Sequence, residues 1–200
     1  MKDDFLARVL DMLGEPSWRD RDPEAWRTLE SELGTALPAD FKEIVDAYAP
    51  VQVNGHLYLH HPATQRWNLG EWIRSMADAW SQIDWDWAEP EGDPRASLGI
   101  EELVFGTADG LVPLVSTDRG ETIFFAPQAD KGKGALFVES EGEFFEYAMT
   151  FSEWLYRWLI GEDVAGPNSS AFYPGPVALR DLPMTPGEQP EERYGPPRGM

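Results

Sequence analysis

The chain of 200 residues contains no cysteine. Disulfide bonds, thiolate nucleophiles and cysteine-ligated metal sites are therefore excluded. Histidine is also scarce, because His56, His60 and His61 are the only three. On one strand, His56 and His60 would share a face but lie about 13 Å apart, too far to bind one metal ion without help from folding. A metal or catalytic role is the alternative, but we expect exposed polar strand positions, no metal and no cofactor.

A long apolar run is missing as well. The N-terminal sequence MKDDFLARVLDMLG alternates charged and apolar residues, unlike the continuous apolar region of a signal peptide. The longest stretch without an acidic or basic residue, Ala47–Gln65, contains two prolines and all three histidines. Such a stretch does not resemble a membrane span. We therefore expect a cytoplasmic protein that has no membrane partner.

Basic residues are few: 16 Lys and Arg face 36 Asp and Glu, for a formal net charge of −20. Residues 1–166 hold 32 of the acids and 13 of the bases, so the negative field belongs to this part of the chain. Such a field repels nucleic acids and anionic lipids and attracts cationic partners. We expect no nucleic-acid binding. An acidic surface also favours solubility without any partner, and that alternative stays open.

The usual catalytic motifs are absent too. The segment ADKGKGAL has two glycines and two lysines, but no helical pattern follows that would present backbone N–H groups to a phosphate. No Gly-x-Ser-x-Gly nucleophile elbow occurs. Neighbouring acids such as Glu101 and Glu102 arise by chance at this density, whereas acid–base catalysis needs two carboxylates in different environments around a cleft. None of these patterns identifies a catalytic residue.

Aromatic residues are plentiful, with nine Trp, ten Phe and six Tyr, and many recur at helical spacing. Asp22 and Pro23 are typical of a helix start, and Gly34 of a helix end. Pro38 then begins a new helix in a new direction. Thr150 and Glu153 fit a capping box. The spacing predicts helices over residues 5–13, 23–33, 38–48, 69–83 and 151–160.

Apolar and polar residues alternate on both sides of Asn54-Gly55, which predicts a β-hairpin. Four further apolar runs bounded by turns predict antiparallel strands: 102–106, 111–117, 121–127 and 135–148, the last folded into a hairpin at Glu141-Gly142.

The composition changes after Gly166. Residues 167–200 contain 8 of the 17 prolines, which excludes a helix and makes a packed sheet improbable. We predict one domain over residues 1–166 and a Pro-rich tail over 167–200 that is largely extended or disordered. The segment AFYPGPVAL can still place its aromatic side chains against the domain.

The sequence IDWDWAEPEGD concentrates five carboxylates and two indoles without a base. In an exposed loop, the indoles would supply contact area and the acids would complement a basic partner. In the alternative, both indoles pack inward while the acids face water.

Three blocks in order resemble the SUKH superfamily, which includes the yeast cell-wall-synthesis regulator family and many bacterial immunity proteins. The blocks are WRTLESELGTALPADFKEIVDAY, LVPLVSTDRGETIFF and FFEYAMTFSEWLYRWLIG. The resemblance spans residues 15–162 and implies an α+β fold, with helices packed on a mostly antiparallel sheet, and no enzymatic activity. In bacteria, it also implies binding of polymorphic toxins, many of them nucleases.

From this resemblance and the charge, we expect an immunity protein that binds and neutralises a basic toxin domain. A regulatory scaffold that recruits proteins through the domain and the Pro-rich tail is the alternative. We expect the partner to contact acidic loops on the sheet side of the domain. The expected partner-binding residues are Asp84, Trp85, Asp86, Trp87, Glu89, Asp109, Asp118, Glu121 and Glu141.

Overall fold

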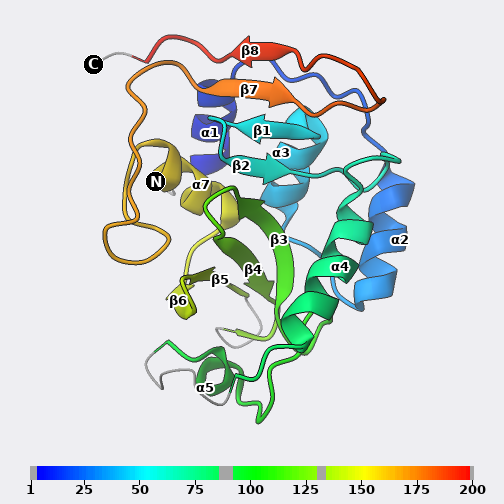
Figure 1. Ribbon diagram of the computed structural model, residues 1–200, viewed down its shortest axis with the longest axis vertical. Coiled ribbons are helices and arrows are strands. Elements are labelled where there is room, and N and C mark those ends of the chain that lie inside the picture. Colours follow the sequence, from blue (N-terminus) through cyan, green and yellow to red (C-terminus); the bar gives the residue numbers. More distant parts are fainter. Residues whose placement is uncertain (1–3, 86–91, 130–133, 199–200) are drawn as a thin grey trace.

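A computed structural model describes residues 4–85, 92–129 and 134–198 (Figure 1). The helices are α1 (Phe5–Leu13), α2 (Pro23–Leu33), α3 (Ala39–Tyr48), α4 (Leu69–Ser81), α5 (Pro94–Leu98) and α7 (Phe151–Leu159). The Asp22 side chain caps α2 by accepting backbone N–H bonds, and Gly34 ends this helix with a left-handed φ of 71°. Thr150 caps α7 by accepting the N–H of Glu153. The predicted long helices are therefore confirmed, whereas α5 was not expected.

A single antiparallel sheet has the strand order β6-β5-β4-β3-β2-β1-β7-β8. The strands are β1 (Val51–Val53), β2 (Leu57–Leu59), β3 (Val112–Thr117), β4 (Thr122–Ala126), β5 (Ala135–Ser140), β6 (Glu143–Tyr147), β7 (Ala178–Asp181) and β8 (Glu192–Tyr194). The predicted hairpins around Asn54-Gly55 and Glu141-Gly142 are present, with Val53 opposite Leu57 and Ser140 opposite Glu143. The expected α+β fold with an antiparallel sheet is confirmed.

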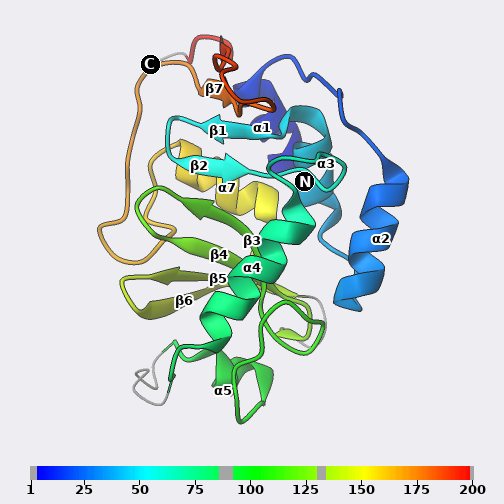
Figure 2. The ribbon, with the colours of Figure 1, turned by 45° about the vertical axis from the view of Figure 1, so that its right-hand side comes forward.

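Helices cover both faces of the sheet (Figures 1 and 2). On one face, α1, α3 and α7 enclose the larger core, in which Phe41 packs edge-to-face on Phe151 and Trp154 is fully buried. Alternate side chains of β4 and β5, such as Ile123 and Val138, point into this core. The period of two along each strand thus sends one set of side chains to α1, α3 and α7 and leaves the other for the opposite face.

The opposite face carries a smaller, aromatic core beside α4. Phe124 and Phe137 of the sheet pack there with Trp80 of α4 and with Phe105. Residues 102–106 were expected to form a strand, and this was wrong: Phe105 makes only an isolated bridge with Leu111. Phe105 and the partly buried Leu103 pack on the smaller core that covers the sheet, whereas Val104 is exposed.

The break between α2 and α3 is held by one carboxylate. Glu30 Oε1 accepts the Leu37 N–H at 2.8 Å and also binds Lys42 Nζ at 2.7 Å. Glu30 lies on α2, Lys42 lies on α3, and Leu37 precedes the Pro38 at which the chain turns. A side chain of α2 therefore fixes the direction of α3.

Two strands come from the Pro-rich segment. Strand β7 pairs with β1 along its length, with Gln52 opposite Arg180, and β8 pairs with β7. Val177 and Leu179 are buried against the larger core. The expectation that a packed sheet was improbable in residues 167–200 was therefore wrong. The prolines flank β7 and β8 and do not interrupt them, so they remove no donor from either ladder.

Candidate functional site

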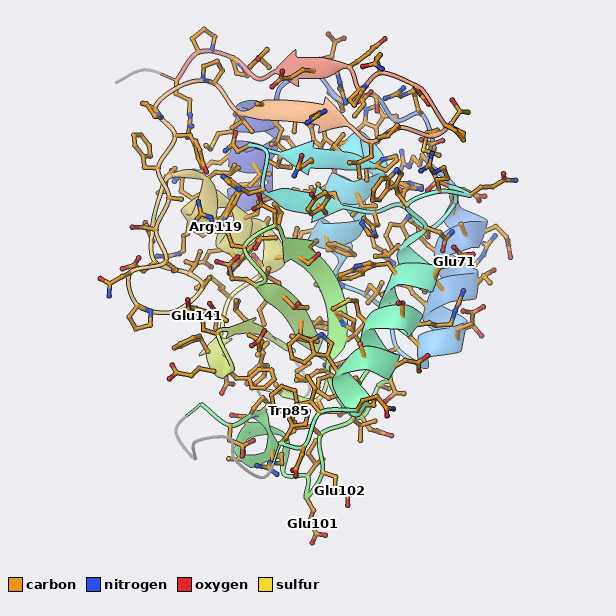
Figure 3. All side chains as sticks on the ribbon, viewed as in Figure 1. Glu71, Trp85, Glu101, Glu102, Arg119 and Glu141 are labelled. Carbon is orange, nitrogen blue, oxygen red and sulfur yellow. The ribbon has the colours of Figure 1, made fainter. Side chains whose placement is uncertain are left out.

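The nine residues expected to bind a partner fall in separate parts of the molecule. Asp86, Trp87 and Glu89 lie outside the described residues. Figure 3 shows Trp85 beside the lower part of the sheet, apart from Glu141 and Arg119. Asp109 is exposed in the turn before β3, close to the end of α2, since a Cβ on Gly34 would lie 3.8 Å from Ala108. The six described residues therefore do not form one continuous patch.

Trp85 belongs to the smaller core. Its side chain is only 7% exposed, and its ring stacks on Trp80 with the centroids 5.5 Å apart. The indole Nε1–H donates to the backbone oxygen of Trp80 at 3.2 Å. The Phe144 ring also packs on the Trp85 ring, with the centroids 5.1 Å apart. Trp85 therefore packs inward, as in the alternative considered for the IDWDWAEPEGD segment, while the neighbouring Asp84 is exposed.

Asp118, Glu121 and Glu141 lie in the β3–β4 and β5–β6 turns, which occupy the same end of the sheet. Asp118 Oδ1 lies 2.6 Å from His56 Nδ1. Glu121 is half-buried and accepts a hydrogen bond from the Thr117 hydroxyl. Arg119 lies between these acids and reaches the Tyr173 hydroxyl at 3.3 Å. The turn surface is therefore acidic but already engaged in internal contacts.

A buried carboxylate supports this end of the sheet. Glu139 is 6% exposed, and its Oε1 accepts the Gly142 N–H at 2.7 Å. Burial raises the pKa of Glu139, the Gly142 hydrogen bond partly opposes this, and the nearby Glu121 carboxylate adds to it. The side chain fixes the Glu141-Gly142 turn and does not face a partner.

The histidines are not the exposed strand positions that we expected. His60 is 8% exposed and lies between the rings of Trp67 and Trp72. His61 is fully buried, and its Nδ1 accepts the Ala63 N–H, so Nε2 carries the proton that faces Asp46 Oδ1 at 3.3 Å. Burial lowers the pKa of both imidazoles, that of His60 to about 4. Both rings are parts of the fold.

Asp46 connects this buried histidine to the first sequence block. Its Oδ1 accepts the Trp26 indole N–H at 2.7 Å, and its Oδ2 lies 3.5 Å from Arg21 Nε. Because each polar atom of this group has a partner, it stabilises the packing of α2 on α3. The motif that carries the family resemblance therefore builds structure.

A hollow of about 490 Å³ lies at the starts of α3 and α7, but its carboxylates are engaged: Asp40 accepts the Ser152 N–H and Glu153 pairs with Arg157. Within residues 4–85, 92–129 and 134–198, no three His, Asp or Glu side chains gather as a metal site would require. Nor does the described chain contain a helix long and apolar enough to cross a bilayer.

A second concentration of acids was missed by the sequence reasoning. Two adjoining hollows, of about 230 and 390 Å³, share Leu29, Glu32, Gly70 and Arg74 and form one groove between α2 and α4. We call this the α2–α4 groove. Its acids come from two segments about forty residues apart in the printed sequence. Helical periodicity indicates which residues share a face within each segment, but it does not indicate that the two faces meet.

Comparison with known families gives one match. The description of the matching family is SMI1 / KNR4 family (SUKH-1), and the match covers residues 22–157. It begins at the N-cap of α2 and ends inside α7, so it leaves out α1, β7 and β8. No curated protein and no solved structure matches the chain significantly. Since the match spans more than half of the 200 residues, the chain belongs to the SMI1 / KNR4 family (SUKH-1).

Proposed function

We propose that this protein is a cytoplasmic immunity protein that binds and neutralises a cognate toxin without catalysing a reaction. The observation that carries the proposal is family membership over residues 22–157 in a chain whose formal charge is −20. A nuclease toxin needs a basic surface to bind its phosphate substrate, and an acidic inhibitor gains both attraction and complementarity from that surface.

The test uses the toxin encoded beside this protein. Titration calorimetry of the two purified proteins should give tight binding that weakens as salt rises, because ions screen the attraction between the partners. Co-expression should also restore growth of cells that produce the toxin. Absence of binding at low salt would overturn the proposal.

A scaffold role remains the second candidate, because two aromatic residues of the Pro-rich segment are exposed. Phe172 is 62% exposed and Tyr194 is 63% exposed. A protein carrying Phe172→Ser and Tyr194→Ser should still neutralise the toxin if immunity is the function. The scaffold role would be favoured by two results together. The variant would no longer recruit the cellular proteins that the unaltered chain recruits, and the neighbouring toxin would not be neutralised by either protein.

A further inference from the structure

The α2–α4 groove is narrow at its centre and open at both ends. Gly70 lies at the centre, where an added Cβ would be 3.3 Å from Leu29 Cδ1. Residues of both helices line the two hollows, and Figure 3 shows Glu71 on α4, on the side toward α2. The glycine lets the two helices approach closely while leaving the flanking hollows accessible.

The lining combines apolar and acidic groups. Leu33, Ile73 and Ala77 border the smaller hollow. Five carboxylates and one guanidinium, that of Arg74, line the two hollows together; the acids are Asp22, Glu24, Glu32, Glu71 and Asp78. Asp22 caps α2 and Glu24 pairs with Arg27, which leaves Glu32, Glu71 and Asp78 as the acids offered to a partner. Such a surface suits a long cationic side chain, whose methylene groups pack on apolar atoms while the charge reaches these acids.

The groove already holds one cation of its own. Arg74 Nη1 of α4 lies 2.9 Å from Glu32 Oε2 of α2, at the position where the two hollows join. The side chains are 59% and 53% exposed, so water screens the pair and its contribution is small. A cation from another protein can therefore compete with Arg74 for Glu32.

We propose that the α2–α4 groove binds a segment of a protein partner that carries arginine or lysine side chains. The surplus of carboxylates selects a cationic partner over a nucleic acid or a lipid surface. The bases of the chain's own C-terminal segment lie elsewhere: Arg180 is on β7 within the sheet, Arg193 pairs with Asp181, and Arg198 donates to the Leu159 carbonyl. The proposal rests on the proposed function, because it places the basic partner on this groove.

A blocked peptide of alternating arginine and alanine serves as the probe. Added to the isotope-labelled full chain, it should shift the amide resonances of α2 and α4 more than those of the sheet turns. The variant Glu32→Gln with Glu71→Gln should bind the peptide about fivefold to tenfold more weakly, from the loss of two charge contacts. The matched control is Glu101→Gln with Glu102→Gln, which removes the same charge from exposed positions outside the groove.

A single substitution distinguishes binding at the groove from a general attraction of the peptide to the negative charge of the protein. Arg74→Gln frees Glu32 and should strengthen peptide binding by about twofold to fivefold. Arg119→Gln removes the same charge at the β3–β4 turn and should change binding less. Equal gains in the two variants would mean that only net charge matters, and would overturn the groove.

The remaining outcomes are distinct. Equal losses in the two glutamate double variants, or shifts spread over the whole acidic surface, would overturn the groove while leaving the proposed function intact. Shifts in α2 and α4 that depend on protein concentration without peptide would show a second copy of the chain in the groove, which also contradicts the proposal. Failure of the neighbouring toxin to bind the unaltered protein would instead overturn the proposed function.

Discussion

Strands β3 to β6 follow one another along the chain and pair in that order. Beyond β3 the order leaves the sequence: β2 pairs with β3, β1 pairs with β2 and with β7, and β8 pairs with β7. We call β3–β6 the hairpin half of the sheet and β1, β2, β7 and β8 the closing half. The hairpin half lies inside the family match, but the closing half takes two strands from beyond it. A family match can therefore end before the sheet that its residues build is complete.

The largest effect is expected from removing the C-terminal part of the closing half. A chain ending at Gly166 loses the buried side chains of Val177 and Leu179, worth about 3 to 6 kcal/mol, and uncovers the edge of β1. Because a whole domain is stable by only about 5 to 15 kcal/mol, we expect this chain to be largely unfolded or aggregated. Thermal melting by circular dichroism measures the loss.

Neighbouring substitutions test the same contact without shortening the chain. Leu179→Asp places a charge in the core and should lower the melting temperature strongly, whereas Arg180→Asp on the exposed face should change it little. If residues 1–166 melt like the full chain, β7 and β8 are dispensable and the predicted tail is correct.

Beside the hairpin half, Trp85→Ala should cost about 3 to 5 kcal/mol in the free energy of unfolding, because it leaves a cavity in the smaller core that covers these strands. Denaturant titration measures this cost. Trp18→Ala, at a residue that is 38% exposed, is the matched control and should cost about 1 kcal/mol or less. A Trp85→Ala protein of normal stability that no longer binds its toxin would return Trp85 to the interface.

The two halves should also respond to acid in opposite directions. In the closing half, burial lowers the pKa of His60 to about 4, against an ordinary value of 6.5. The unfolded chain then takes up this proton first, so stability falls as the pH drops from 6.5 towards 4, by at most about 3 kcal/mol. In urea unfolding at several pH values, the His60→Phe protein should lose less stability over this range than the unaltered chain.

The smallest effect is expected at Glu139 in the hairpin half. Its pKa is raised in the folded protein, mainly by burial, so the protonated form favours folding and this benefit is lost as the pH rises through the folded pKa. Glu139→Gln keeps an oxygen for the Gly142 N–H and should stabilise the protein at pH 7 by about 1 kcal/mol or less. The gain should disappear in acid, and Glu141→Gln, an exposed neighbour, should show neither change.

Local signals in the sequence were enough to predict the hairpin half and most helices. Asp22, Gly34 and Thr150 act through hydrogen bonds or backbone angles within a few residues, so their effect is readable without the fold. Strand β7 could not be predicted in this way. Its four residues are stabilised by β1, which lies far away in the sequence, and proline content masked its alternation.

The candidate site was harder to predict than the fold. Acidic composition indicates a cationic partner, but exposure and proximity depend on tertiary packing. Trp85 shows the first difficulty, because an indole among carboxylates is equally compatible with an interface and with a core. Glu32 and Glu71 show the second, because only the packing of α2 on α4 brings them to one groove.

The carboxylate of Glu30 sets a limit on how the chain can vary. It holds a backbone N–H before the turn and an ammonium group after it, so the length of the connection between α2 and α3 is measured against one side chain. An inserted residue would release at least one of these contacts and rotate the apolar stripe of α3 away from Trp26. Surface loops elsewhere can lengthen or shorten during divergence, but the connection between α2 and α3 has to keep its length.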